Sequence, residues 1–403
     1  MPKSQRPENK TDSIKTTDML AGGLPYFLLF SIYAVVNTYL PLMLRTLGFS
    51  ATEIGILLGI IEIAGLSVPF LVTPQLDRTG QYGLVMYVFG LDIAFLLLPI
   101  LRFRSFFITA VCLGIFAAGL KGLVPVLDGF TAKSLGSRST QYGKIRAFGS
   151  IGFVCFNLFL QTSSCISGKN PASVILSISV NALLFVAALH RIPDLHNNDS
   201  VLNSTDKEQP DKQELRNSAE AAFPKRFREY LVLIFLAFLG LAPCQRFFSL
   251  YVEEYVKIEA SAGLWALSAM AEIPLLIMSG KLIQRFGKER LLIVCLFSIV
   301  IRNLCYIFIP GVGGAIVGQL LHSLSFGLFH PLGVLLCVSH SCGKPATAMT
   351  FFTAVNGIAN VIGSIIGGYI IEYAGYPALF LFFGLFPFIG AGLSFFIMRH
   401  TKQ

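Results

Sequence analysis

Residues 59–81 of the chain read GIIEIAGLSVPFLVTPQLDRTGQ, and residues 268–290 read SAMAEIPLLIMSGKLIQRFGKER. In each stretch, an apolar run contains one Glu-Ile pair and ends in a charged turn with a glycine. Glu62 aligns with Glu272, and the turn glycine follows at nearly the same distance in both stretches. Such an internal repeat is typical of membrane transporters that are built from two related halves.

The composition is that of an integral membrane protein. The chain has 54% hydrophobic and 13% charged residues and a mean hydropathy of +0.69, whereas soluble domains carry roughly 25% charged residues. A helix needs about 20 mostly apolar residues to cross a bilayer, and such runs recur from end to end. They predict twelve transmembrane helices, near residues 20–44, 52–74, 82–101, 106–132, 142–164, 172–190, 229–252, 262–281, 289–309, 313–338, 346–370 and 377–398.

A polar segment divides this all-α membrane protein into two pseudo-symmetric bundles of six helices. Residues 191–226 are rich in charge and nearly free of aromatic side chains, which is typical of a flexible linker. We therefore expect an N-terminal tail at 1–18, an N-terminal bundle at 19–190, and the linker. The C-terminal bundle and a short tail follow at 227–403.

The basic residues predict the orientation of the chain. The net charge is +9, but the Lys and Arg residues form no single patch, so the charge does not indicate nucleic-acid binding. Most of the 31 lie in short segments on the side of the two termini and the linker, and cytoplasmic loops carry such an excess. We expect a monomeric, multi-pass protein of the cell (inner) membrane with both termini cytoplasmic and lipid around it.

Ionisable side chains inside a bilayer are costly and mark candidate functional sites. Leaving histidine aside, the predicted helices carry four acids and four bases, and this balance fits paired groups around a water-filled cavity. The ionisable residues are Glu62, Asp92, Lys121, Asp128, Arg146, Arg246, Glu272, Arg302, His322 and His330.

Asp128 and Arg146 are the best-matched pair, because they lie on consecutive antiparallel helices. Lys121 is seven residues from Asp128, about 10.5 Å along the axis, so we do not expect these two to pair directly. Arg246 follows Pro243, where a broken helix can expose it to a cavity. We assign to solute binding Asp128, Arg146, Lys121, Arg246, Asn37 and Gln245, with a purely structural Asp128–Arg146 bridge as the alternative.

Other charged residues suggest coupling and gating. Glu62 and Glu272 occupy equivalent positions in the two halves, where they can either take part in proton coupling or pin helices together. Asp92 fits a structural role better. The turns that follow the repeated stretches carry gating candidates, although a plain solvated turn is the alternative. These candidates are Asp77, Arg78 and Arg285.

The sequence gives no sign of an enzyme or a metalloprotein. The eight cysteines are scattered, mostly within apolar runs, and no pair has metal-site or redox-motif spacing. We find no nucleophile–base arrangement. We expect neither a metal nor a cofactor, and a proton gradient as the driving force.

Four motifs resemble the proton-coupled symporters of the major facilitator superfamily, near the phenylpropionate permease and lactose permease group. They are YFLLFSIYAVVNTYLPLML at 26–44, the pair PVLDGF and YGKIRAFGSIGF at 125–130 and 142–153, LWALSAMAEIPLLIMSGKLIQRFG at 264–287, and QLLHSLSFGLFH at 319–330. The resemblance covers essentially the whole chain and implies a twelve-helix major facilitator fold.

The resemblance also implies roles for single residues. In lactose permease, an acid on helix 4 and an arginine on helix 5, eighteen residues apart, bind the sugar, and Asp128 and Arg146 have this spacing. Arg302 and His322 match the arginine and histidine of its proton-coupling site. Ser325 stands where that permease has its proton-carrying glutamate, so the carrier here is Asp128 or Glu272, tuned by His322 and Arg302.

These observations predict proton-coupled import of a small organic solute by alternating access. Because three arginines and a lysine lie within the bundle, an aromatic or carboxylate anion is favoured over a sugar or nucleoside-like solute. One alternative is a drug or metabolite exporter on the same fold. However, residues 149–152 read GSIG and lack the helix 5 pattern of drug antiporters. The other alternative is a membrane sensor that does not transport.

Overall fold

The computed structural model describes residues 16–135, 141–163, 165–192, 224–342 and 344–399. The described residues are almost entirely helical and contain no strand. The N-terminal half comprises α1 (Thr16–Thr46), α2 (Ala51–Thr79), α3 (Tyr82–Phe95), α4 (Leu98–Arg102), α5 (Phe106–Leu135), α6 (Tyr142–Thr162) and α7 (Pro171–Leu189). The predicted all-α architecture is confirmed, and most of the predicted linker lies outside the described residues.

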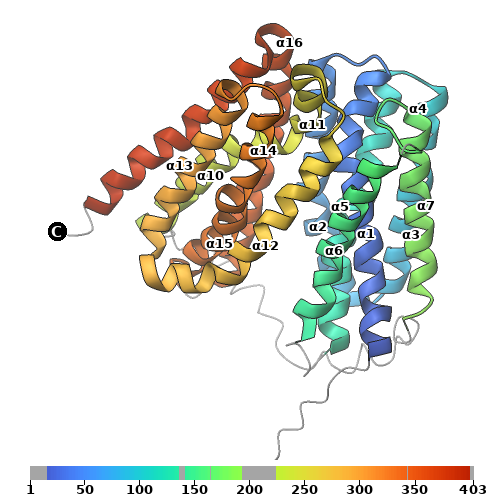
Figure 1. Cartoon of the computed structure of the whole chain (residues 1–403). Coiled ribbons are helices and arrows are strands. Elements are labelled where there is room, and N and C mark those ends of the chain that lie inside the picture. The colour runs from blue at the N-terminus through green and yellow to red at the C-terminus, as the bar shows by residue number, and fades with distance from the viewer. Residues whose placement is uncertain (1–15, 136–140, 164, 193–223, 343, 400–403) are drawn as a thin grey trace, which may run out of the picture.

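The C-terminal half begins after the linker and repeats this arrangement. It comprises α10 (Lys225–Arg246), α11 (Phe248–Leu250), η3 (Tyr251–Val256), α12 (Ser261–Phe286), α13 (Lys288–Phe308), α14 (Val312–Leu320), η4 (Ser323–Leu328), α15 (Phe329–Ser339) and α16 (Pro345–Arg399). Figure 1 shows the two halves side by side, with α1–α7 on the right and α10–α16 on the left.

Eleven stretches are long and apolar enough to cross a membrane within the described residues. The last of them covers two of the predicted helices, because α16 runs on through a break at Gly375. The φ angle of Gly375 is 79°, a left-handed conformation that glycine adopts without steric cost. The predicted runs 346–370 and 377–398 therefore meet at this glycine, and the count of twelve crossings agrees with the structure.

The halves meet along two equivalent helix pairs. Helix α2 packs against α16, and α6 packs against α12. Since α2 and α12 carry the two aligned sequence stretches, the repeat seen in the sequence corresponds to a structural repeat at the interface. We call the end where α7 stops and α10 starts the linker end, and the opposite end the distal end.

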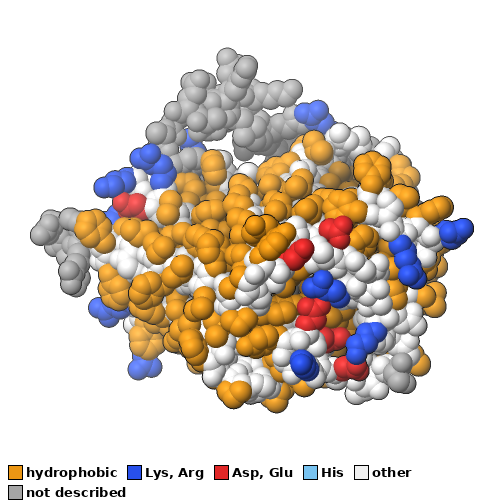
Figure 2. Space-filling view, turned by 90° about the horizontal axis from the view of Figure 1, so that it is seen from above, with side chains coloured by type: hydrophobic (Ala, Val, Ile, Leu, Met, Phe, Trp, Pro, Cys, Tyr) orange, Lys and Arg blue, Asp and Glu red, His pale blue; other side chains and the backbone are white. Residues whose placement is uncertain are grey.

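Polar contacts join the halves at the distal end. Arg45 of α1 pairs with Glu254 of η3 at 2.6 Å, and the Tyr376 hydroxyl donates to the same carboxylate at 2.6 Å. The backbone N–H of Thr52 donates to Glu372 of α16 at 2.8 Å. Figure 2, which looks onto this end, shows acidic and basic side chains side by side across the middle of the face.

Two glycines bring the backbones of α2 and α16 into direct contact near the distal end. A Cβ atom added to Gly55 would overlap the carbonyl oxygen of Ser364, and one added to Gly368 would overlap the carbonyl oxygen of Ala51. Small residues allow such an approach between helices in a membrane. The distal end is therefore closed by both backbone packing and charge pairs.

The contact between the halves is lost toward the linker end. All six buried residues of α12 lie within its first eight residues, from Ser261 to Ser268. Further along the same helix, Ile273 and Leu276 are 45% and 42% exposed. The space between the halves therefore opens toward the linker end.

We expect the substitution Gly368→Ala to weaken the distal closure, because the added methyl group meets the backbone of α2. The matched control is Gly280→Ala, where an added Cβ finds nothing within 4 Å. The measurement is the labelling rate of a cysteine at position 37, in a background without the exposed Cys155, Cys165 and Cys342, by an impermeant maleimide added on the distal side. A several-fold faster reaction in Gly368→Ala only is expected, and equal rates in both variants would contradict it.

Candidate functional site

A cavity of about 430 Å³ lies between the two halves. Both halves contribute to its lining, which includes residues of α1, α2, α5 and α6 from the N-terminal half and of α10, α12, η4 and α16 from the C-terminal half. Aromatic rings form part of the wall, and ionisable and amide side chains form another part, beside small and aliphatic residues. The aromatic residues are Phe30, Tyr33, Phe153, Trp265 and Phe326.

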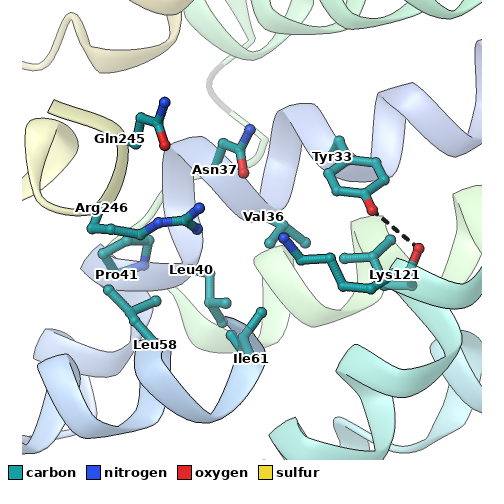
Figure 3. A pocket seen from close by; sticks show the side chains of 11 residues that line it. Tyr33, Val36, Asn37, Leu40, Pro41, Leu58, Ile61, Lys121, Gln245 and Arg246 are labelled. Carbon is teal, nitrogen blue, oxygen red and sulfur yellow. Dashed lines mark hydrogen bonds between the residues drawn. The ribbon is translucent and has the colours of Figure 1, made fainter. Parts of the chain in front are cut away.

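The cavity narrows toward the distal end into a pocket of about 20 Å³. Apolar side chains of α1 and α2 surround this pocket, and it has room for about one water molecule. In Figure 3, the Lys121 amine and the Arg246 guanidinium point toward each other at the edge of this pocket, beside the amides of Asn37 and Gln245. The apolar residues are Val36, Leu40, Pro41, Leu58 and Ile61 of these two helices, together with Leu120 of α5.

Glu62 lies between two cations at this end of the cavity. Its Oε1 atom accepts a hydrogen bond from Lys121 Nζ at 2.9 Å and pairs with Arg246 Nη1 at 2.8 Å. Glu62 is 6% exposed. Because a buried charge needs a partner, the two cations hold the carboxylate in place, and the cluster of three carries one excess positive charge.

Arg246 reaches this cluster because of the way α10 ends. The helix contains Pro243 and stops at Arg246, as the sequence suggested for a broken helix. The Nε atom of Arg246 donates to Asn360 of α16 at 3.4 Å. Arg246 therefore joins α10, α16 and the Glu62 carboxylate of the other half.

A second cluster links Glu272 to Arg302 through His322. Arg302 is 1% exposed, and its Nη1 atom lies 3.1 Å from His322 Nδ1. Since arginine only donates hydrogen bonds, Nδ1 accepts, and the proton of the neutral ring is on Nε2. That atom lies 3.3 Å from Glu272 Oε2, so the imidazole bridges the guanidinium and the carboxylate.

The other partners of Arg302 are neutral. Its side chain donates to Gln319 at 2.8 Å, to the Tyr306 hydroxyl at 3.0 Å and to Ser325 at 3.3 Å. Ser325 is the residue that replaces the glutamate of lactose permease. The negative charge nearest to this buried cation in the identified network is therefore Glu272, one imidazole away.

Asp128 and Arg146 lie together but apart from the cavity wall. Arg146 Nε is 3.6 Å from Asp128 Oδ1, and the Tyr26 hydroxyl donates to the same oxygen at 2.8 Å. The Arg146 guanidinium stacks on the ring of Phe30, 4.3 Å from its centroid, and Phe30 lines the cavity. The pair thus lies between the cavity and the linker end, in contact with the wall through one ring.

Four of the remaining predicted residues line the cavity, and Asp92 does not. Asn37, Gln245, Lys121 and Arg246 all line the cavity, and Lys121 and Asp128 have separate partners, as expected from their spacing. Asp92 packs against Gly119 of α5.

The gating candidates lie at the linker end. Arg78 is in the last turn of α2, and Arg285 is in the last turn of α12. Neither belongs to the ion pairs identified among the described residues, and the side chain of Asp77 lies outside the described part of the chain. Their gating role stays a prediction.

Sequence reasoning missed several cavity residues. Asn356 and Asn360 line the cavity, and their spacing of four residues in an apolar run places them on one helix face, a signal that could have been read. Trp265, the one tryptophan of the chain, also lines the cavity and donates to the Ser249 hydroxyl at 3.2 Å. Its position gave no signal in the sequence.

Comparisons with known proteins agree with this architecture. The model of the MFS_1 like family matches residues 23–382. A maltose permease of Geobacillus stearothermophilus is 25% identical, over 91% of both chains. A probable 3-phenylpropionic acid transporter of Escherichia coli (strain K12) is 21% identical, over 91% of this chain and 97% of its own. The crystal structure of the nucleoside transporter NupG matches with a TM-score of 0.81 at 16% identity, over 96% and 99% of the chains.

We expect Arg146→Lys to impair solute uptake although the charge is kept. An ammonium group has neither the planar fork of arginine nor its stacking on Phe30, which is worth about 1–2 kcal/mol for a partly desolvated pair. Uptake should therefore fall by about fivefold to thirtyfold, with membrane expression checked first. The control is Arg228→Lys, on the exposed start of α10. Normal uptake by Arg146→Lys would show that the pair with Asp128 is only a structural bridge.

Proposed function

The chain belongs to the MFS_1 like family and is a secondary transporter of the major facilitator superfamily, and we propose that it imports a small organic carboxylate together with protons. Its similar proteins are transporters, not enzymes. In this proposal, the linker end faces the cytoplasm of a cell in whose inner membrane the protein resides, and the solute crosses by alternating access.

One observation carries the choice of solute class. Glu62 faces both Lys121 and Arg246 at hydrogen-bonding distance, so the distal end of the cavity holds two cations and one anion. A solute carboxylate would balance the excess charge, and charge-assisted hydrogen bonds are the strong ones. The aromatic wall of Phe30, Phe153 and Trp265 would accept an apolar or aromatic body.

The amides of the cavity favour a second class of solute. Asn37, Gln245, Asn356 and Asn360 offer paired donors and acceptors that suit hydroxyl groups. A maltose permease and a nucleoside transporter are among the similar proteins. A neutral polyol is therefore the alternative solute, and it would leave the excess charge of the cluster at the distal end of the cavity unbalanced.

The proton in this proposal binds at Glu272. The carboxylate is 21% exposed on its side chain and lines the cavity, so water can deliver a proton to it. His322 is fixed as a neutral donor by Arg302, which leaves Glu272 as the member of this cluster able to change its protonation.

The charges of the two clusters account for coupling. The two clusters together carry one positive charge in excess when Glu272 is ionised, because Arg302 offsets Glu272 and the cluster of Glu62, Lys121 and Arg246 keeps its extra cation. One carboxylate at Lys121 and Arg246 and one proton at Glu272 leave this charge unchanged. Because the loaded and the empty carrier then hold equal charge, the proposal implies one proton for each monocarboxylate.

The solute class is tested by binding to the purified protein, read from the fluorescence of Trp265. The probes are 3-phenylpropionate, its neutral amide, maltose and a nucleoside. We expect 3-phenylpropionate to bind and its amide to bind poorly. In Arg246→Gln the carboxylate should bind about tenfold to a hundredfold more weakly, because a hydrogen bond between charged groups is worth about 1.5–3 kcal/mol. Lys281→Gln, on the exposed part of α12, is the control. Tight binding of maltose or the nucleoside alone would establish the neutral class instead.

Coupling is tested in liposomes that contain the purified transporter. We expect uphill accumulation of the carboxylate under a pH gradient, with proton uptake in a ratio of one to one. In Glu272→Gln, accumulation should be lost while downhill exchange persists, because the amide cannot carry the proton. Proton-driven accumulation by this variant would remove Glu272 as the carrier. Solute release against the gradient, or no transport, would favour the exporter or the sensor.

A further inference from the structure

We propose that a groove on the outside of the N-terminal half binds one anionic phospholipid, with its phosphate at Arg191 and an acyl chain between α1 and α6. This groove is separate from the solute cavity, and none of its lining residues belongs to that cavity. Its volume is about 480 Å³, which is comparable to that of the solute cavity.

The lining of the groove combines apolar side chains with one cation, which matches the acyl chain and the charged headgroup of an anionic phospholipid. Among the described residues of the chain, five apolar ones and the cation Arg191 line the groove. Four of them follow one another along α1, and Phe148 of α6 closes the other side. The apolar residues are Leu20, Ala21, Leu24, Phe27 and Phe148.

The groove exists because α1 and α6 are held in a particular packing. The ring of Phe148 lies against Gly23, where an added Cβ would overlap it. At the deeper end, Gly152 lets α6 approach the backbone of Phe27 so closely that no side chain fits between them. The Phe148 ring bounds the groove on one side, and the close contact between Gly152 and the backbone of Phe27 bounds it at the deeper end.

The depth and position of the groove fit the bilayer. Seven residues of helix separate Leu20 from Phe27, which is about 10.5 Å along the axis. The hydrocarbon of one leaflet is about 15 Å thick. The groove is therefore long enough to contact most of the half of an acyl chain that lies nearest the headgroup. Leu20 is 52% exposed, so the groove is open at the side, where lipid can enter.

Arg191 lies at the level expected for the phosphate. It follows the last residue of α7, Leu189, at the linker end, and its side chain is exposed. No ion pair has been identified for it among the described residues. Basic residues at helix ends on the cytoplasmic side attract anionic lipid headgroups, at about 1 kcal/mol for each cation. Charge complementarity therefore favours an anionic phospholipid over a zwitterionic one.

A lipid in this groove would act on helices that form the transport pathway. Helix α1 carries Phe30 of the cavity wall, and α6 carries Arg146, which stacks on that ring. Phe148 lies two residues beyond Arg146. We therefore expect the bound lipid to change the rate of transport as well as the stability of the N-terminal half.

The proposal is tested by fluorescence quenching with brominated lipids in nanodiscs. Leu20→Trp at the rim of the groove, in a Trp265→Phe background, gives a single reporter. We expect brominated phosphatidylglycerol to quench it with about fivefold higher apparent affinity than brominated phosphatidylcholine. Arg191→Gln should abolish this preference, whereas Arg228→Gln, an exposed arginine at the linker end of the other half, should retain it.

Two further measurements distinguish a bound phospholipid from free phosphate, which carries the same charged group without an acyl chain. Free inorganic phosphate should not displace phosphatidylglycerol, and Ala21→Phe, which fills the groove, should reduce quenching by both lipids. Equal quenching by the two lipids with Arg191 intact, or an unchanged preference in Arg191→Gln, would overturn the proposal. Displacement by inorganic phosphate would show a headgroup site without an acyl groove and would also overturn it. These readouts need no solute, so they are independent of the proposed transport activity.

Discussion

The carboxylate of Glu62 must have cations beside it, and this requirement organises the centre of the molecule. A charge that is removed from water is tolerated only with close partners, and Lys121 and Arg246 meet that need from α5 and α10. Because Glu62 and Arg246 belong to different halves, the same contact also ties the halves together at the end of the cavity. The cavity wall, the excess positive charge and the choice of solute class all follow from this one arrangement.

The second organising feature is the difference between the two ends of the interface. At the distal end, glycine backbones touch and charged side chains pair across the halves. At the linker end, α12 has no buried residue beyond Ser268. The distal contacts are short and local, so in the proposed alternating access they could be broken together when the halves rotate.

The sequence was sufficient to predict the architecture and part of the site. The repeat around Glu62 and Glu272, the broken helix at Pro243 and the spacing of Asp128 and Arg146 were all readable from the order of residues. The grouping of Glu62 with Lys121 and Arg246 was not, because three helices far apart in the chain must be packed before their side chains meet. The same holds for the Arg45–Glu254 pair. These two residues lie near the distal ends of α1 and η3, where charged residues are ordinary and carry no signal by themselves.

The apolar pocket at the distal end of the cavity has a consequence for energy conservation. Protons move quickly along continuous chains of water, so in the proposed symport a chain of water across the closed end would dissipate the proton gradient. Val36, Leu40, Leu58 and Ile61 leave space of only about 20 Å³, enough for about one water molecule. In the proposed symport, these four aliphatic side chains would limit the chain of water at the closed end and so reduce proton leak while the opposite end stands open.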